Sequence, residues 1–322
     1  MSVKIVYEDK DFKHLLPIVA TNEFLNSKSN NYGWFIDDNF ILPFIIEKKF
    51  IFKRIIFTYS VIKRDSNKIN QKDFLNSVVE LSKTLDIDFI YQPYAFAIFE
   101  EIPDNSIYIK FGTYKVDLTY TEDELFLNLH TKHRNVIRKA MKNKLEVFNG
   151  LEYIDECFKL IEDTLTRQKQ PFMGFDAIQN MSDNLKGNIA FYIVKNGEDV
   201  EGSAIVIYNE LEAYYIFAGS CVKTSAGAMN LLVWQIICDM KSKGVLSLDF
   251  VGARLNPQKG SKFEGIQRFK SRFGSTLKEG YLWKFPIKPF KYKMFRFITW
   301  LYYKLINKTY MGDIIDQELK NV

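Results

Sequence analysis

Three short runs of β-forming residues follow one another closely, at 189–195, 202–208 and 211–218. Asn196-Gly197 and Asn209-Glu210 separate these runs, and such residue pairs favour tight hairpin turns. Because short turns join strands that run in opposite directions, the three runs predict an antiparallel meander.

Helices are predicted on both sides of the meander. Apolar residues at helical spacing predict one helix at 154–168 and another at 229–241, which Gly244 ends. A loop of small residues at 219–228 precedes the second helix, and a strand is predicted at 245–251 after it. This order of elements predicts an α+β fold with mostly antiparallel sheets flanked by helices.

The preceding part of the chain also mixes strands and helices. The predicted elements are strands at 39–47 and 51–59 joined by a charged turn, a helix at 70–84, a strand at 89–91 and two strands within 106–118. Thr121 and Glu124 form a capping box, which predicts the start of one long helix ending near Asn143, before a strand at 145–148.

The length of 322 residues exceeds what one hydrophobic core usually supports. We expect two closely packed domains, at 1–144 and 145–285, followed by a terminal segment at 286–322, because no flexible linker separates the halves. The three cysteines are too scattered for a disulfide framework. Charged residues interrupt every apolar run before it is long enough to span a membrane. The amino terminus also lacks the apolar stretch of a secretory signal, so the expected location is the cytoplasm.

Most common catalytic motifs are absent. The chain has no Gly-x-Ser-x-Gly, no phosphate-binding Gly-Lys-Ser/Thr, no Gly-x-Gly-x-x-Gly and no His-Glu-x-x-His. Serine hydrolases, P-loop enzymes, dinucleotide-dependent dehydrogenases and zincins are therefore disfavoured. His130 and His133 lie three residues apart but have no carboxylate or Cys companion, so we expect two surface histidines and no metal.

The small-residue loop before the helix at 229–241 is a candidate cofactor site. Backbone amides at a helix start attract anions, so the run Ser225, Ala226, Gly227 and Ala228 could bind a pyrophosphate or a carboxylate. The alternative is a tight loop whose small residues serve packing alone.

The segment 248–274 carries the most specific pattern. A strand ends in Asp249-Phe250-x-Gly252, and Phe269-Lys270-x-x-Phe273-Gly274 follows on a short basic helix. This pattern resembles the carboxyl-terminal signature of the Fem-type aminoacyltransferases and their acyltransferase relatives in the GNAT superfamily. The supporting residues are Gly219-Ser220, Leu231-Leu232-x-Trp234 and the run at 133–140.

The resemblance implies two tandem GNAT-like domains and a transferase. The expected donor is an acyl-CoA such as acetyl-CoA, or an aminoacyl-tRNA. The expected acceptor is an amine of a nucleotide- or lipid-linked precursor of cell-envelope polysaccharide or peptidoglycan. The family links the lysine of the Phe-Lys pair to catalysis, which carries over to Lys270. The chain departs from relatives in two ways: 168–188 is too short for the helical-hairpin arm that some members of the family have, and the usual GNAT pyrophosphate fingerprint is missing.

Other candidate residues have two readings each. Asp249 could be a general base for the acceptor amine, or it could cap the next turn or pair with Arg254 or Arg268. Arg134 and Arg138, one helical turn apart, could clamp a phosphate of the substrate or lie in water. We also count Phe269 and Arg254 among the substrate-binding candidates.

The terminal segment 286–322 interleaves lysines with aromatic residues, and no acidic residue occurs between Gly280 and Gly312. Such a helix could contact an anionic membrane surface or stack nucleic-acid bases. It could also dock on the body through Phe295, Ile298 and Leu301. Besides the transferase, two functions stay open: a non-catalytic GNAT-fold binding module, and a nucleic-acid-binding protein that uses this segment.

Overall fold

The computed structural model describes residues 3–64, 70–168, 170, 172–306 and 310–320. The chain forms two compact units, a central unit at 113–278 and a flanking unit made of 1–112 with 279–322. The predicted boundaries after residues 144 and 285 fall inside these units. The difference arises because the chain after residue 278 returns to the flanking unit, where Trp283 packs against Phe57 and Phe99.

The flanking unit is built on a six-stranded sheet with the order β1-β2-β3-β4-β6, in which β5 pairs with β3. Its strands are β1 (Lys4–Val6), β2 (Tyr32–Ile36), β3 (Phe40–Lys49), β4 (Phe52–Phe57), β5 (Ile62–Lys63) and β6 (Phe89–Ile90). Its helices are α1 (Asn22–Lys28), α2 (Gln71–Thr84), α9 (Pro289–Leu305) and α10 (Ile314–Lys320). The predicted hairpin is present, and its turn lies at Phe50 and Ile51 because Lys49 pairs with Phe52.

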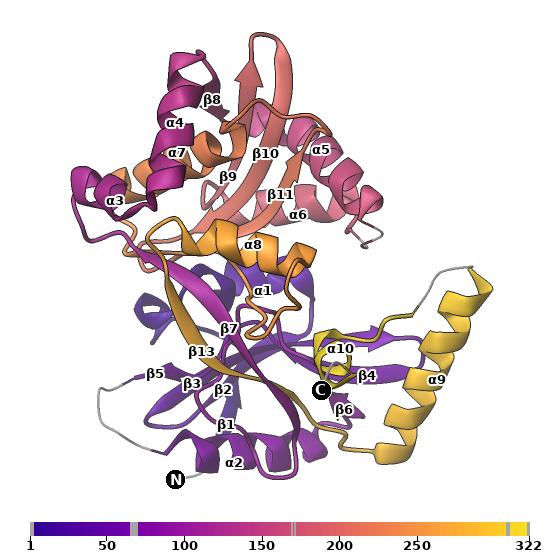
Figure 1. The fold of residues 1–322 in the computed structure, drawn as a ribbon. Helices are drawn as coiled ribbons and strands as arrows, with labels where there is room; N and C mark the ends of the chain where they lie inside the picture. The colour runs from indigo at the N-terminus through magenta and orange to yellow at the C-terminus, as the bar shows by residue number, and fades with distance from the viewer. Residues whose placement is uncertain (1–2, 65–69, 169, 171, 307–309, 321–322) are drawn as a thin grey trace. The chain divides into compact units, whose positions relative to one another are not determined.

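Helix α2 buries the apolar face that the sequence indicates, including Phe74, Val78 and Val79. Helix α9 lies at the β4–β6 edge of this sheet (Figure 1), where Phe295 packs against Phe52 and Phe89. Of the other two predicted docking residues, Ile298 is partly buried against the same cluster and Leu301 is exposed. Residues 307–309 and 321–322 of the predicted terminal segment lie outside the described residues.

The central unit contains most of a seven-stranded sheet with the order β13-β7-β12-β11-β10-β9-β8. Its strands are β7 (Ile107–Asp117), β8 (Glu146–Asn149), β9 (Ile189–Asn196), β10 (Asp199–Tyr208), β11 (Ala213–Ser220), β12 (Ser247–Asp249) and β13 (Thr276–Lys284), of which β7 and β13 continue into the flanking unit. Its helices are α3 (Glu122–Asn128), α4 (Thr131–Lys142), α5 (Ile154–Arg167), α6 (Phe175–Leu185), α7 (Ala228–Ser242) and α8 (Lys262–Ser271). The antiparallel meander β9-β10-β11 is confirmed, and β12 joins it in parallel.

Helices cover both faces of this sheet, with α4 and α7 on one side and α5 on the other (Figure 1). Gly219 allows the close approach of α5, because a Cβ atom there would lie 2.5 Å from the carbonyl oxygen of Leu160. The α+β class predicted from the order of elements is therefore confirmed.

Several predicted elements differ in detail. The capping box of Thr121 and Glu124 is present, but the predicted long helix is two helices, α3 and α4. The break occurs because Leu129 and His130 are extended, and the His130 ring starts α4 by accepting a hydrogen bond from the Lys132 amide. The two strands predicted within 106–118 are the single strand β7, and α6 was not predicted. No helix within the described ranges is long and apolar enough to span a membrane.

Candidate functional site

The turn after β12 has an unusual backbone. Val251 and Gly252 both have positive φ angles, 58° and 74°. For a β-branched residue such as Val this conformation is strained, and it persists only where surrounding interactions enforce it. Here Asp249 Oδ1 accepts hydrogen bonds from the Val251 amide at 2.6 Å and from the Thr113 hydroxyl, whose oxygen accepts from the Gly252 amide at 3.2 Å. Strain at a turn so firmly held marks a candidate functional site.

Lys270 binds this turn. Helix α8 begins at Ser261, which caps the Glu264 amide, and carries Lys270 in its last turn. The Lys270 ammonium donates to the carbonyl oxygens of Val251 and Gly252, both at 2.8 Å. Burial lowers the pKa of Lys270 to about 8, and the nearby Asp249 carboxylate opposes this shift. The turn thus holds a partly desolvated cation in one place.

Asp249 is fully buried and cannot itself reach a substrate in solvent. Sheet register places it opposite Lys115 of β7, whose ammonium lies 3.5 Å from Asp249 Oδ2. Burial raises the pKa of Asp249 to about 6; Lys115 opposes this rise and the nearby Glu212 adds to it. The structure gives Asp249 the turn-capping role that was the alternative to a general base, and pairs it with Lys115 rather than with Arg254 or Arg268.

Glu212 completes this polar cluster. Its carboxylate accepts hydrogen bonds from the Lys115 ammonium, the Tyr214 hydroxyl and, at 3.1 Å, the Ser247 hydroxyl. Only 5% of Glu212 is exposed, so its charge depends on these donors. We refer to Lys115, Glu212 and Asp249 as the buried charge cluster.

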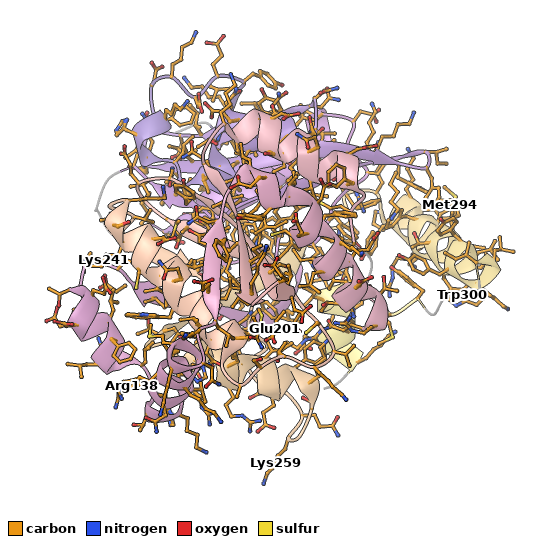
Figure 2. The ribbon with its side chains drawn as sticks, turned by 90° about the horizontal axis from the view of Figure 1, so that it is seen from above. Arg138, Glu201, Lys241, Lys259, Met294 and Trp300 are labelled. Carbon is orange, nitrogen blue, oxygen red and sulfur yellow. The ribbon has the colours of Figure 1, made fainter. Side chains whose placement is uncertain are left out.

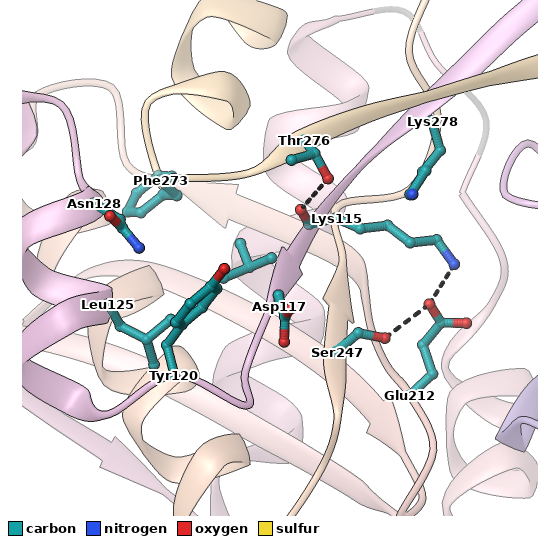
Figure 3. Close-up of a pocket in the computed structure, with 12 residues that line it drawn as sticks. Lys115, Asp117, Tyr120, Leu125, Asn128, Glu212, Ser247, Phe273, Thr276 and Lys278 are labelled. Carbon is teal, nitrogen blue, oxygen red and sulfur yellow. Dashed lines mark hydrogen bonds and ion pairs between the residues drawn. The ribbon is translucent and has the colours of Figure 1, made fainter.

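A pocket of about 550 Å³ opens beside the buried charge cluster (Figure 3). Lys115, Glu212 and Ser247 line it together with apolar Leu125 and Phe273. Further polar lining residues are Asp117, Tyr120, Asn128, Thr276 and Lys278. Lys270 and Asp249 are not among the lining residues, whereas Lys115, which lies 3.5 Å from Asp249, is one of them.

His133 fixes α8 against α4. Its ring packs against Phe269 and Phe273, with centroid distances of 5.4 and 4.6 Å, and Nε2 donates to the Phe269 carbonyl oxygen at 3.1 Å. Burial lowers the pKa of His133 to about 4, so the ring is neutral near pH 7. The expectation of a surface histidine is wrong for His133. In the described ranges, no group of three His, Cys, Asp or Glu side chains could hold a metal ion.

The predicted cofactor loop is already occupied by an internal carboxylate. The Ser225 amide and hydroxyl donate to the two oxygens of Glu201, at 2.6 and 2.7 Å. Gly227 and Ala228 pack closely, since a Cβ on Gly227 would lie 2.3 Å from the Val136 carbonyl oxygen and Ala228 is fully buried. Ala226 lies between Ser225 and Gly227 in the same loop. This geometry favours the packing role over a pyrophosphate site.

The structure places the arginine candidates apart from the strained turn or in other interactions. Arg134 donates to the carbonyl oxygens of Leu127 and Leu129 and so links α3 to α4. The Arg138 guanidinium lies 5.1 Å from the centroid of the Phe126 ring. The Arg254 guanidinium lies 4.1 Å from the centroid of the Phe263 ring. The Phe269 ring packs on His133, and Phe269 directly precedes Lys270 in α8.

Sequence reasoning missed four residues of this region: Thr113, Lys115, Glu201 and Glu212. A signal was available in their surroundings, because Lys115, Glu201 and Glu212 are charged residues within β-rich runs. Nothing in the sequence indicates that residues 115 and 249 are cross-strand neighbours.

Comparison with known proteins agrees with the fold. Residues 195–299 match the model of the FemAB family. The crystal structure of FemX superposes with a TM-score of 0.70 at 13% identity, over 90% of this chain and 99% of that one. The C-terminal domain of a putative lysylphosphatidylglycerol synthetase from Agrobacterium fabrum superposes with a TM-score of 0.55 at 13% identity, over 85% of this chain and 90% of that one. A protein of unknown function from Bacteroides thetaiotaomicron superposes with a TM-score of 0.55 at 12% identity, over 82% of this chain and 89% of that one.

No curated protein resembles the chain closely enough in sequence to count as a match. The chain has the fold of FemX, because the structural match extends over 90% of this chain and 99% of that one. The predicted resemblance to the Fem-type family is confirmed, since residues 195–299 match the FemAB family.

Proposed function

We propose that this protein is a transferase that moves an acyl or aminoacyl group from an activated donor onto an amine. The observation that carries the proposal is the Lys270 ammonium, held by two carbonyl oxygens of a strained turn. The match of 195–299 to the FemAB family supports it, because that segment includes both the turn and Lys270.

Lys270 would act on charge that develops during transfer. The acceptor amine forms a C–N bond to the donor carbonyl carbon, the C–O or C–S bond to the carrier breaks, and the amine proton passes to the leaving group or to solvent. Two hydrogen bonds leave a third N–H of the ammonium for the carbonyl oxygen, which becomes negative in the transition state. Asp249 is a positioning residue here, since it holds the turn and does not reach the substrate.

The pocket beside the buried charge cluster is the proposed place for part of the acceptor. Lys115 and Lys278 offer positive charge, and Glu212 offers a carboxylate to an ammonium group. These groups suit an amine-bearing, anionic acceptor, and the family resemblance favours a nucleotide- or lipid-linked precursor of the cell envelope. A lipid-linked acceptor would require the enzyme to work at a membrane surface.

Of the two donors, aminoacyl-tRNA is favoured. The Glu201 carboxylate occupies the start of α7, where the pyrophosphate of an acyl-CoA would need backbone amides. Helix α4 presents exposed Arg138, Lys139 and Lys142, which could contact RNA phosphates. Acyl-CoA stays the second donor candidate.

Transfer assays with labelled aminoacyl-tRNA or acetyl-CoA, and with nucleotide- and lipid-linked amine acceptors, test the proposal. Lys270→Met should lower turnover by about a hundredfold, the usual effect of losing one donor to a developing oxyanion. Lys262→Met, on the same helix and exposed, is the matched control and should keep full activity.

Unchanged turnover of a folded Lys270→Met protein would exclude the role of Lys270. Transfer from acetyl-CoA alone would reverse the choice of donor. Binding of an acceptor without transfer from either donor would favour the alternative of a non-catalytic binding module.

A further inference from the structure

Helix α9 has two faces of different character. Tyr292, Phe295 and Thr299 are buried on the side that packs against the flanking unit. Phe290 begins a second row, in which Phe297, Leu301 and Leu305 follow 7, 11 and 15 residues later. These intervals are close to whole helical turns, so the four side chains form one ridge on the exposed part of the helix. We call these four residues the outer ridge.

The outer ridge is strongly exposed. The exposed fractions are 78% for Phe290, 59% for Phe297, 39% for Leu301 and 74% for Leu305. Trp300, 44% exposed, lies next to the ridge and extends outward from α9 (Figure 2). Proteins that remain monomeric in water seldom expose so many large apolar side chains together, so this ridge marks an interaction surface.

Positive charge borders the outer ridge. Lys293 and Lys304 are exposed on the same half of the helix, and the Lys304 ammonium lies 5.1 Å from the centroid of the Trp300 ring. Lys288 and Lys291 instead hold the start of α9 to the flanking unit through Asp86 and Asp88. No acidic residue occurs between Gly280 and Gly312, so nothing in the helix itself offsets the lysines along the ridge.

We propose that α9 seats the protein on an anionic lipid bilayer. A helix with an apolar ridge, aromatic residues and bordering lysines lies in the plane of the interface, where rings enter the headgroup region and ammonium groups meet lipid phosphates. The buried face anchors the helix to the folded body, so docking on the body and contact with lipid involve different sides of α9.

Charge complementarity favours lipid over a second copy of the chain, because facing copies of this helix would oppose lysine to lysine. Aliphatic Leu301 and Leu305 favour lipid over nucleic acid, because they offer no ring on which a base could stack. This inference goes beyond the proposed function and does not depend on transfer activity.

Co-sedimentation with vesicles tests the inference. The full chain is mixed with vesicles of phosphatidylcholine alone or of equal parts phosphatidylcholine and phosphatidylglycerol. The ridge variant carries Phe290→Ser, Phe297→Ser and Leu305→Ser, and the charge variant carries Lys293→Gln and Lys304→Gln. A control variant removes exposed apolar residues of the central unit, by Leu127→Ser, Leu151→Ser and Val222→Ser.

We expect the wild type and the control to bind the anionic vesicles, and the ridge variant to bind at least tenfold more weakly. The charge variant should lose its preference for anionic over neutral vesicles. Circular dichroism verifies that each variant is folded. We expect all of them to fold, because none of the substitutions changes the buried face of α9. The inference fails if the wild type does not bind anionic vesicles or if the ridge variant binds as the wild type does. It also fails if light scattering shows that the ridge mediates dimers, or if the ridge proves to bind oligonucleotides.

Discussion

Replacement of Asp249 by Asn should remove a pH dependence of stability that the buried carboxyl group imposes. Burial raises the pKa of Asp249 from 3.8 to about 6. Between these pH values the folded protein keeps a proton that the unfolded chain has released. The carboxyl group therefore favours the folded state below pH 4, and this contribution is lost as the pH rises through about 6.

The size of the effect follows from the shift. The interval from 3.8 to about 6, at about 1.4 kcal/mol for each pH unit, corresponds to about 3 kcal/mol. The asparagine side chain of the variant cannot ionise, and its amide oxygen can still accept from the Val251 amide and the Thr113 hydroxyl. The free energy of unfolding of the wild type, relative to Asp249→Asn, should thus fall by about 3 kcal/mol between pH 4 and pH 7.

Urea unfolding of both proteins across this pH range measures the difference. Asp199→Asn changes an exposed carboxylate of the same unit and serves as the control, for which we expect less than about 0.5 kcal/mol. Carbon-13 NMR of the Asp249 carboxyl group gives its titration directly and links any change in stability to this group.

A pH-independent difference between wild type and Asp249→Asn would refute the reasoning. So would a difference of opposite sign, in which the wild type gains stability as the pH rises. Either result would mean that the Lys115 ammonium and the two hydrogen bonds stabilise the ionised carboxylate by more than its burial costs.

Two further predictions concern packing and charge. Asp313→Asn should lower the free energy of unfolding by about 3 kcal/mol, because it removes the bidentate partner of the buried Lys284 ammonium. Asp86→Asn removes an exposed ion pair and should lower the free energy of unfolding much less. Equal losses in urea unfolding would contradict this. Gly219→Ala should cost about 1–3 kcal/mol by forcing α5 away from β11, since the new methyl group would meet the backbone at Leu160. A variant as stable as the wild type in the same assay would show that α5 can move freely.

Local chemistry explains which elements the sequence predicts well. The Thr121 and Glu124 side chains each accept a hydrogen bond from the other residue's backbone amide, and the Asn196-Gly197 pair suits a tight turn. Both features involve residues close in the chain, and both are present. The break between α3 and α4 was missed because it depends on a distant contact, in which the His130 amide donates to the carbonyl oxygen of Arg272.

By itself the sequence determined the α+β order of elements and the resemblance to the Fem-type family, because these depend on local patterns. The resemblance singles out Lys270 as a candidate residue. Only the tertiary structure decided what surrounds Lys270. Thr113 and Lys115 lie more than 130 residues from Asp249 in the chain, and sheet register brings them together. Burial lowers the pKa of Lys270, and burial together with the charge of Glu212 raises that of Asp249. No local pattern in the sequence specifies this burial.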